Sequence, residues 1–198
     1  MSCVQSRLQS AQRGSCRTAL ASSPPIPPRQ QPRSDMPPIQ VAVCGPRHCT
    51  DADADNAREV GRLLARSGAT VLCGGGTGVM AAVAEGASSE GGLVIGVRPD
   101  TDPSRICDGL SAVLYTNMGE ARNAILIWSA DAVIVVGGSW GTLSELALAN
   151  RRSGVPVTSI GGWQIVDADG APVSASHISA NAAAAVEFAL GRGSMNPS

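Results

Sequence analysis

The sequence lacks several features that common classes of binding site require. It contains no lysine, because all 15 of its basic residues are arginine, and this excludes a Walker A phosphate loop. The formal net charge is −1, no basic stripe is evident, and the only aromatics are three Trp, one Tyr and one Phe. We therefore expect no nucleic-acid partner. No apolar run reaches the roughly 18 residues of a membrane-spanning helix, so we expect no membrane partner.

The residues that usually bind transition metals are also sparse and badly spaced. The sequence has two histidines and six cysteines, and none of the cysteines forms a Cys-x-x-Cys pair. Zinc and iron–sulfur sites are therefore not expected. Cys44 and Cys73 each end an apolar run, which predicts small buried side chains. Free cysteines of this kind fit a reduced compartment, so we predict a cytoplasmic protein.

Residues 1–38 differ in composition from the rest of the chain. They are rich in Ser, Gln, Arg and Pro, and the prolines at 24–28 exclude a helix or a central strand. We predict a disordered segment. An organelle transit peptide and a translation start near Met36 are the alternatives that the sequence leaves open. Residues 192–198 are predicted to be a flexible tail, so the folded domain spans residues 39–191.

From residue 39 onward, short apolar runs alternate with segments of helical period. The runs that we predict as strands are 39–44, 69–73, 93–97, 111–115, 133–136 and 155–160. Helices are predicted between them, followed by a last helix at about 176–190. This alternation predicts an α/β fold: a single Rossmann-like domain with a parallel sheet of six or seven strands and helices on both faces.

The stretch 133–146 is the most informative part of the sequence. It reads as a buried strand, a turn with three glycines and a helix for which Thr142 is the predicted N-cap. The unpaired N–H groups and positive dipole end of such a helix favour phosphate. The structural alternative is a capping box, because Thr142 and Glu145 have its spacing, and a capping box performs no chemistry.

A second glycine-rich turn lies at 74–78, and Arg122 lies near the start of a further helix. The face of that helix predicted to be buried comprises Ala121, Ala124, Ile125 and Trp128. Arg122 is then either a solvated surface residue or the partner of an anionic ligand. The loops after parallel strands meet at one edge of the sheet, which favours nucleotide or phosphate binding there. Neither glycine turn has the G-x-G-x-x-G spacing of a dinucleotide site.

The segment Gly137-Gly138-Ser139-Trp140-Gly141-Thr142-Leu143-Ser144-Glu145 resembles the P-G-G-x-G-T-x-x-E motif of the Lonely guy (LOG) family of cytokinin-activating phosphoribohydrolases. The turn at 74–80 looks like the first glycine loop of that family, and 119–123 stands where it has an Arg-Lys pair. A neighbouring branch with G-x-A-R-N and G-G-x-x-G-T-x-x-E is closer, and it includes the molybdenum cofactor carrier proteins. The resemblance covers about residues 39–160.

The resemblance implies a nucleoside 5′-monophosphate pocket that requires no metal, in a homodimer. The ligand-binding residues that it implies are Gly75, Gly76, Thr77, Asn117, Gly137, Gly138, Ser139, Gly141 and Thr142. It implies that Arg122 holds the phosphate-ribose unit and that Glu145 acts at the N-glycosidic bond. A carboxylate there can stabilise the positive charge on the ribose ring and activate the attacking water.

Two departures from the hydrolase motif leave the activity open. Val136 replaces the Pro that opens the motif, and Asn123 replaces the Lys. The first hypothesis is an enzyme that cleaves a nucleoside monophosphate to base and ribose 5-phosphate. The second is a carrier that holds an AMP-like nucleotide, molybdenum cofactor or a related phosphorylated pterin intact. Both hypotheses have a small phosphorylated ligand as the partner.

Overall fold

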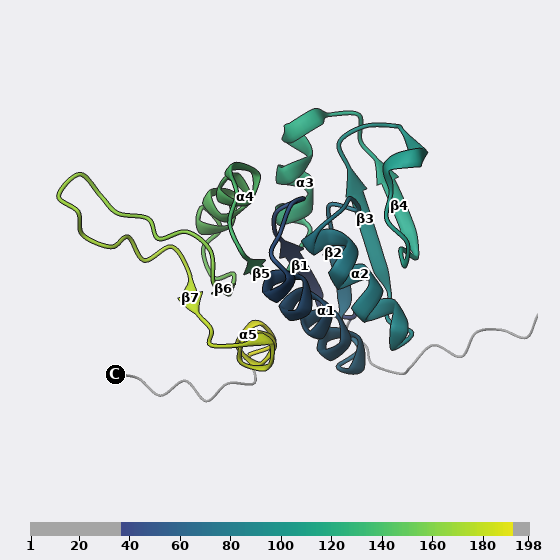
Figure 1. Cartoon of the computed structure of the whole chain (residues 1–198), viewed down its shortest axis with the longest axis horizontal. Coiled ribbons are helices and arrows are strands. Elements are labelled where there is room, and N and C mark those ends of the chain that lie inside the picture. The colour runs from purple at the N-terminus through teal and green to yellow at the C-terminus, as the bar shows by residue number, and fades with distance from the viewer. Residues whose placement is uncertain (1–36, 192–198) are drawn as a thin grey trace, which may run out of the picture. The chain divides into compact units, whose positions relative to one another are not determined.

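Seven parallel strands form one sheet through the centre of the computed structural model, which describes residues 37–191 (Figure 1). The strands are β1 (Gln40–Cys44), β2 (Thr70–Cys73), β3 (Val94–Arg98), β4 (Ala112–Tyr115), β5 (Ala132–Val136), β6 (Val157–Ile160) and β7 (His177–Ile178). Their order across the sheet is β4-β3-β2-β1-β5-β6-β7. The segment predicted to be disordered, apart from Pro37 and Pro38, and the predicted tail lie outside the described residues.

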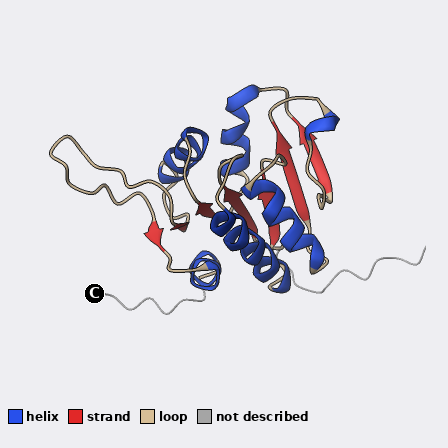
Figure 2. Cartoon of the chain, in the orientation of Figure 1, coloured by secondary structure: helices blue, strands red, loops and turns tan. Residues whose placement is uncertain are grey.

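Helices cover both faces of the sheet (Figure 2). The described residues form five α-helices, α1 (Asp51–Arg66), α2 (Val79–Ser89), α3 (Arg122–Trp128), α4 (Trp140–Asn150) and α5 (Ala182–Ala189), and two 3₁₀ turns, η1 (Pro103–Arg105) and η2 (Gly119–Ala121). Helices α1, α2 and α5 pack together on one face, and α3 and α4 pack on the other. The predicted single α/β domain with a parallel sheet and two helical layers is confirmed.

The central strands are apolar throughout because both of their faces are covered. In β1, Val41 and Val43 belong to the core beneath α1, α2 and α5, while Ala42 and Cys44 belong to the core beneath α3 and α4. Successive side chains of a strand point to opposite faces, so this alternation follows directly from the strand geometry. The prediction that Cys44 and Cys73 are buried is confirmed.

The predicted last helix is wrong at its beginning. Residues 177–178 form β7, and α5 begins at Ala182 with Asn181 as its N-cap. Two contacts explain the difference: the hydroxyl of Thr158 on β6 donates to the carbonyl of His177 and contacts the Ser179 hydroxyl at 2.7 Å. Pairing with β6 therefore holds this segment extended, and the Asn181 side chain, which accepts from the Ala184 N–H, fixes the later helix start.

Helices α1 and α2 approach closely at two glycines. A Cβ on Gly61 would lie 2.3 Å from the carbonyl oxygen of Val83, and a Cβ on Gly86 would lie 1.9 Å from that of Arg58. Neither position can accept a side chain unless the helices separate.

We expect Gly86→Ala to lower the free energy of unfolding by about 1–3 kcal/mol, the usual cost of overpacking, although alanine is the better helix former. Urea denaturation measures this change. Ser88→Ala, at an exposed position of α2, is the control and should change stability by less than about 0.5 kcal/mol. Equal stability of Gly86→Ala and wild type would contradict the close helix approach.

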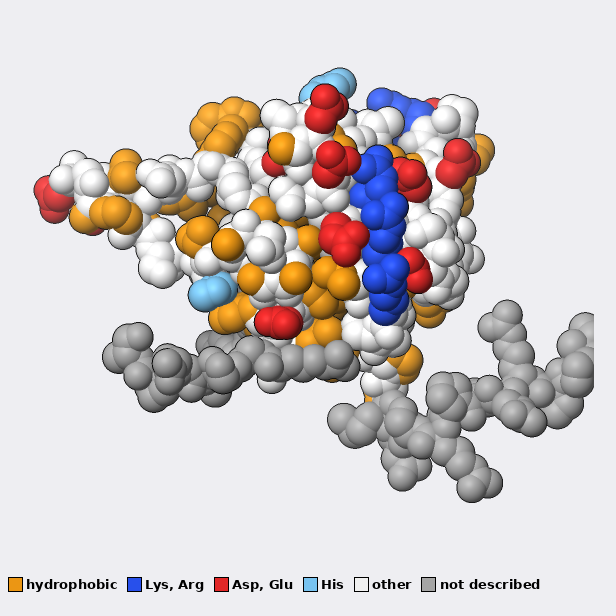
Figure 3. Space-filling view, turned by 60° about the horizontal axis from the view of Figure 1, so that its bottom comes forward, with side chains coloured by type: hydrophobic (Ala, Val, Ile, Leu, Met, Phe, Trp, Pro, Cys, Tyr) orange, Lys and Arg blue, Asp and Glu red, His pale blue; other side chains and the backbone are white. Residues whose placement is uncertain are grey.

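The surface of α1 carries a row of Arg58, Arg62 and Arg66, although no basic stripe was expected from the sequence. Arg58 forms ion pairs with Asp55 of α1 and Glu85 of α2. Arg62 pairs with Glu59 of α1, and Arg66 pairs with Glu90, which follows α2. Figure 3 shows a line of arginines with acidic side chains on both flanks. The paired charges offset one another.

Among residues 37–191, every helix is too short or too polar to span a membrane.

Candidate functional site

A cavity of about 380 Å³ opens where the strand order reverses, at the carboxyl ends of β1 and β5. This is the position at which parallel sheets of this type bind ligands. Its lining comes from four segments of the chain: Val43, Cys44, Gly45, Pro46, Arg47 and His48 at β1; Gly74 and Met80; Glu120, Arg122 and Asn123; and Gly138, Ser139, Trp140, Gly141, Thr142 and Glu145.

The loop after β5 feeds directly into α4, but the N-cap differs from the prediction. Ser139 is the N-cap: its hydroxyl accepts from the Thr142 N–H at 3.2 Å and lies 2.8 Å from the Thr142 hydroxyl. Thr142 is therefore inside the helix, and the capping-box interpretation of Thr142 and Glu145 is wrong. A serine earlier in the turn takes the cap because its extended backbone conformation precedes the first helical residue.

The first helical amides of α4, those of Trp140 and Gly141, have no acceptor within the helix. They lie beside the cavity together with the positive end of the helix dipole. A Cβ on Gly141 would meet only the Ser139 hydroxyl, at 3.9 Å, so the space over this turn is open. The start of α4 therefore has donors, positive potential and room for an anion.

Arg122 and Glu145 face each other inside the cavity wall. The distance from Arg122 Nη1 to Glu145 Oε1 is 3.6 Å, and both side chains are more than nine-tenths buried. Within the described part of the chain, the Nε and Nη1 atoms of Arg122 have no hydrogen-bond partner. A buried guanidinium with unused donors is costly unless a further acceptor satisfies it.

The burial of Arg122 shows that the predicted inner face of α3 is wrong. The buried residues of this helix are Arg122, Asn123, Leu126 and Ile127, whereas Trp128 is exposed and lies over the Arg152 guanidinium. Both sets have helical spacing, so the period alone does not choose between them. The two polar residues face inward because they line the cavity, which rules out a solvated surface arginine.

Gly74 and Cys44 take part in this arrangement, although neither was predicted to contact the ligand, and Gly74 was singled out only as the beginning of the glycine turn at 74–78. A Cβ on Gly74 would lie 2.5 Å from the Met80 sulfur and 2.8 and 2.9 Å from the two terminal nitrogens of Arg122, so a larger residue would displace both side chains. The Cys44 thiol belongs to the same cavity wall as the Glu145 carboxyl, and burial raises the pKa of this thiol well above its usual range. The one feature of the sequence that could have indicated these two residues is their position, since Cys44 ends β1 and Gly74 directly follows β2.

The electrostatics of Glu145 follow from its burial. Desolvation raises its pKa from the usual 4.5 to about 7, while the charge of Arg122 and the hydrogen bond from Cys44 act in the opposite direction. At neutral pH both the protonated and ionised forms are populated. The carboxyl group is therefore suited to gaining or losing a proton.

This pKa makes stability depend on pH in a defined direction. A carboxyl group whose pKa is raised on folding favours the folded state below about pH 4.5, and that contribution disappears as the pH rises through about 7. The loss amounts to about 3 kcal/mol. We expect Glu145→Gln to remove this dependence, so that its unfolding free energy relative to wild type rises between pH 5 and pH 8.

Urea unfolding at the two pH values measures this effect. The two histidines are the same in both proteins, so the difference isolates Glu145. Glu187→Gln, at an exposed position of α5, is the control and should follow wild type. Parallel pH curves for Glu145→Gln and wild type would contradict the raised pKa.

The first glycine loop, at 74–80, lies beside the cavity, and Gly74 and Met80 are its wall residues. Gly75 accepts from the Cys107 N–H, Gly76 packs against Arg98, and the Thr77 hydroxyl donates to the Arg47 carbonyl. Asn117, the one non-glycine residue with positive φ in the described chain, follows β4.

Of the predicted residues, the cavity wall brings together Arg122, Gly138, Ser139, Gly141, Thr142 and Glu145. It does not include Gly75, Gly76, Thr77, Asn117 or Gly137. Sequence reasoning missed Trp140, whose only signal was its place inside the glycine motif.

The fold and this cavity define a Rossmann-type protein with a small-ligand crevice at its strand ends. The chain belongs to the SLOG cluster4 family, whose model matches residues 38–186.

Two relatives were identified by sequence. The chain is 41% identical over 115 residues to an uncharacterised protein of Archaeoglobus fulgidus, a match covering 58% of this chain and 75% of that protein. It is 33% identical over 112 residues to a probable cytokinin riboside 5′-monophosphate phosphoribohydrolase of Oryza sativa. That match covers 54% of this chain and about half, 49%, of the rice protein.

Solved structures of molybdenum cofactor proteins are similar over almost their whole length. The binding protein from Rippkaea orientalis has a TM-score of 0.69 at 30% identity, covering 79% of this chain and 98% of that one. The carrier protein from Chlamydomonas reinhardtii has a TM-score of 0.65 at 28% identity, covering 78% and 99%. DNA processing protein A from Helicobacter pylori, at 19% identity and a TM-score of 0.57, shares the fold alone.

Proposed function

We propose that this protein binds a small phosphomonoester, a nucleoside 5′-monophosphate or a phosphorylated pterin, in the cavity at the start of α4. One observation carries the proposal: the buried Arg122, whose Nε and Nη1 have no hydrogen-bond partner among residues 37–191, lies in the same cavity wall as the first turn of α4. The N–H groups of 138–142 would hold the phosphate, and Arg122 would hold the phosphate-ribose unit. The predicted ligand contacts outside the cavity wall remain predictions; they are Gly75, Gly76, Thr77, Asn117 and Gly137.

The first candidate activity is hydrolysis of the N-glycosidic bond. The rice relative supports it by name, and the Arg122–Glu145 pair supports it by chemistry. Water would add to the anomeric carbon while the bond to the base breaks, giving ribose 5-phosphate and the protonated base. Ionised Glu145 would stabilise the positive ribose ring and take a proton from the water, while the base takes a proton from solvent as it leaves, and the proton on Glu145 then returns to solvent.

The second candidate is carriage of the intact ligand. The match to the two molybdenum cofactor structures spans 98% and 99% of those chains, whereas the match to the rice protein spans 49% of that protein. Asn123 stands where the hydrolases have a lysine, and within the described chain its buried Oδ1 has no partner. An amide can hydrogen-bond to a polar ring edge but brings no charge to a leaving group.

Native mass spectrometry of freshly purified protein tests the proposal. A retained phosphorylated compound, or saturable binding of added AMP, supports the site, and an intact compound recovered after prolonged incubation supports carriage. Protein that carries nothing and takes up neither AMP nor a pterin phosphomonoester would refute it. The same spectra report the number of subunits and so test the homodimer, which remains a prediction.

A further inference from the structure

Two tryptophans from distant parts of the sequence meet at the rim of the cavity. Trp140 is the first residue of α4 and belongs to the cavity wall, yet it is 80% exposed. Trp163 comes from the long loop between β6 and β7 that projects from the sheet in Figure 1. The two ring centroids are 5.0 Å apart and the rings are nearly perpendicular, at 82°. This edge-to-face arrangement is a favoured one for aromatic pairs.

The backbone around this pair leaves room for it. A Cβ on Gly138 would lie 2.7 Å from Cδ1 of Trp163. Gly162 has a φ of +93°, and a Cβ there would lie 2.5 Å from the Gly137 carbonyl oxygen. The loop at 161–163 therefore lies directly against the turn at 137–138, and this contact fixes Trp163 beside Trp140.

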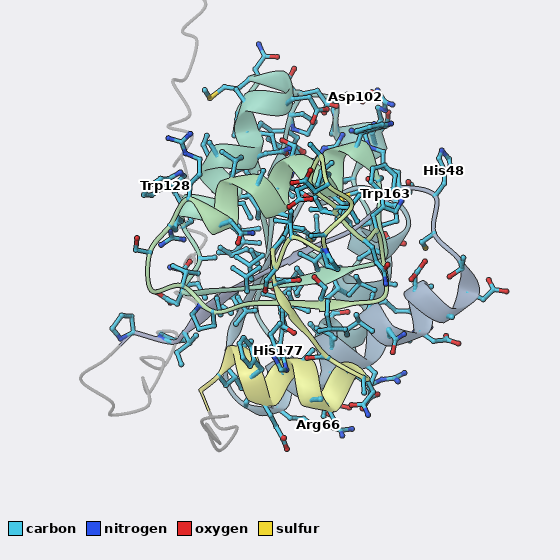
Figure 4. The ribbon with its side chains drawn as sticks, turned by 90° about the vertical axis from the view of Figure 1, so that its left-hand side faces the viewer. His48, Arg66, Asp102, Trp128, Trp163 and His177 are labelled. Atoms are coloured by element: carbon cyan, nitrogen blue, oxygen red, sulfur yellow. The ribbon has the colours of Figure 1, made fainter. Side chains whose placement is uncertain are left out.

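The third tryptophan provides a natural comparison. Trp128 lies at the end of α3, with the Arg152 guanidinium 5.2 Å from its ring centroid. Figure 4 shows Trp163 on the same side of the molecule as His48, a residue of the cavity wall, and Trp128 on the opposite side. Trp128 is exposed like Trp140, but it has no place in the cavity wall.

We propose that Trp140, braced by Trp163, is a stacking platform for the planar heteroaromatic ring of the ligand. This inference rests on the proposed phosphomonoester site. Trp140 stands between Ser139 and Gly141, so a ligand with its phosphate on these amides places its ring next to the indole. A purine and a pterin share the flat π-face that such a platform recognises, and stacking does not require a particular base. A ribose phosphate without a ring makes no use of it.

Calorimetric titration of wild type, Trp140→Ala and Trp128→Ala tests the platform. The probes are AMP, a pterin carrying a phosphomonoester, and ribose 5-phosphate, with chromatography confirming that AMP stays intact. We expect Trp140→Ala to bind the ring-bearing probes about 10-fold more weakly, the usual scale of lost base stacking, and ribose 5-phosphate as before. Trp140→Phe should recover part of the loss, and Trp128→Ala should match wild type. The probe with the larger loss identifies the ring.

Three results would overturn the platform. Wild type could bind AMP and the pterin no more tightly than ribose 5-phosphate, in which case the phosphate site stands and the platform does not. Trp140→Ala could weaken all probes equally, which would mean that the tryptophan only supports the loop. Trp140→Ala could change self-association but not AMP affinity, which would assign the aromatic pair to contact between copies. If no probe binds to wild type, the phosphomonoester site itself fails.

Discussion

Gly141→Asp should weaken phosphomonoester binding at least about 100-fold while leaving the fold as stable as before. A Cβ at this exposed position would meet only the Ser139 hydroxyl, at 3.9 Å, so a side chain can be added here without displacing the backbone. It would stand in the first turn of α4, where a phosphate dianion is proposed to bind. Like charges in contact cost several kcal/mol, and about 2.7 kcal/mol corresponds to 100-fold in affinity.

The same substitution separates binding from stability. Glycine is a poor helix former, and a carboxylate in the first helical turn interacts favourably with the helix dipole. Gly141→Asp should therefore unfold at the same urea concentration as wild type, or a higher one. Gly141→Asn, of almost the same shape but without charge, is the matched control and should lose much less affinity. If Gly141→Asp bound AMP as tightly as wild type does, the proposed position of the phosphate at the start of α4 would be excluded.

Glu145→Gln should reduce hydrolysis of AMP by about 10²–10⁴-fold, the range for losing a positioned general base, if the protein is a hydrolase. Affinity for AMP should stay within a few-fold, because the amide keeps the shape and removes a negative charge from the cavity. Wild-type kcat/KM should rise with pH through about 7, where Glu145 ionises, and level off above it. Release of free adenine, followed by chromatography, measures both effects.

Two comparisons make this result decisive. Glu187→Gln, at the exposed position on α5, should hydrolyse AMP like wild type. Equal release of adenine by Glu145→Gln and wild type would exclude the carboxyl group from the chemistry. No release by either protein, together with tight binding of AMP, would favour the carrier.

The strands and glycine turns could be predicted from the sequence because their signals are local. Apolar runs such as that in β5 end at glycines, and α1 is marked by acidic residues at its beginning and Gly68 after its end. The position of the crevice could be predicted from the topology, because the loops after parallel strands meet at one edge of the sheet. Arg122 and Glu145 were singled out by their places near helix starts, and the family resemblance implied their roles; the structure places them 3.6 Å apart.

Apart from the N-cap of α4, where Ser139 takes the place predicted for Thr142, the failures of prediction share a different cause, because each depends on a contact between distant segments. The face of α3 was misassigned because polar residues point inward only when a cavity lies behind them. The last helix was predicted too long because pairing of residues 177–178 with β6 is not a local property. The Trp140–Trp163 contact joins the start of α4 to the loop after β6, and the cavity wall brings together Cys44 of a strand and Glu145 of a helix.

The contact between Gly74 and Arg122 has a consequence for how this protein can vary. A Cβ at residue 74 would lie 2.5 Å from the Met80 sulfur and 2.8 Å from the nearer terminal nitrogen of Arg122, so these two side chains occupy the space that a larger residue would need. A larger residue 74 is therefore tolerated only when both side chains shift or become smaller. The three positions are epistatic, and the order in which they mutate decides which intermediates still fold around a working crevice.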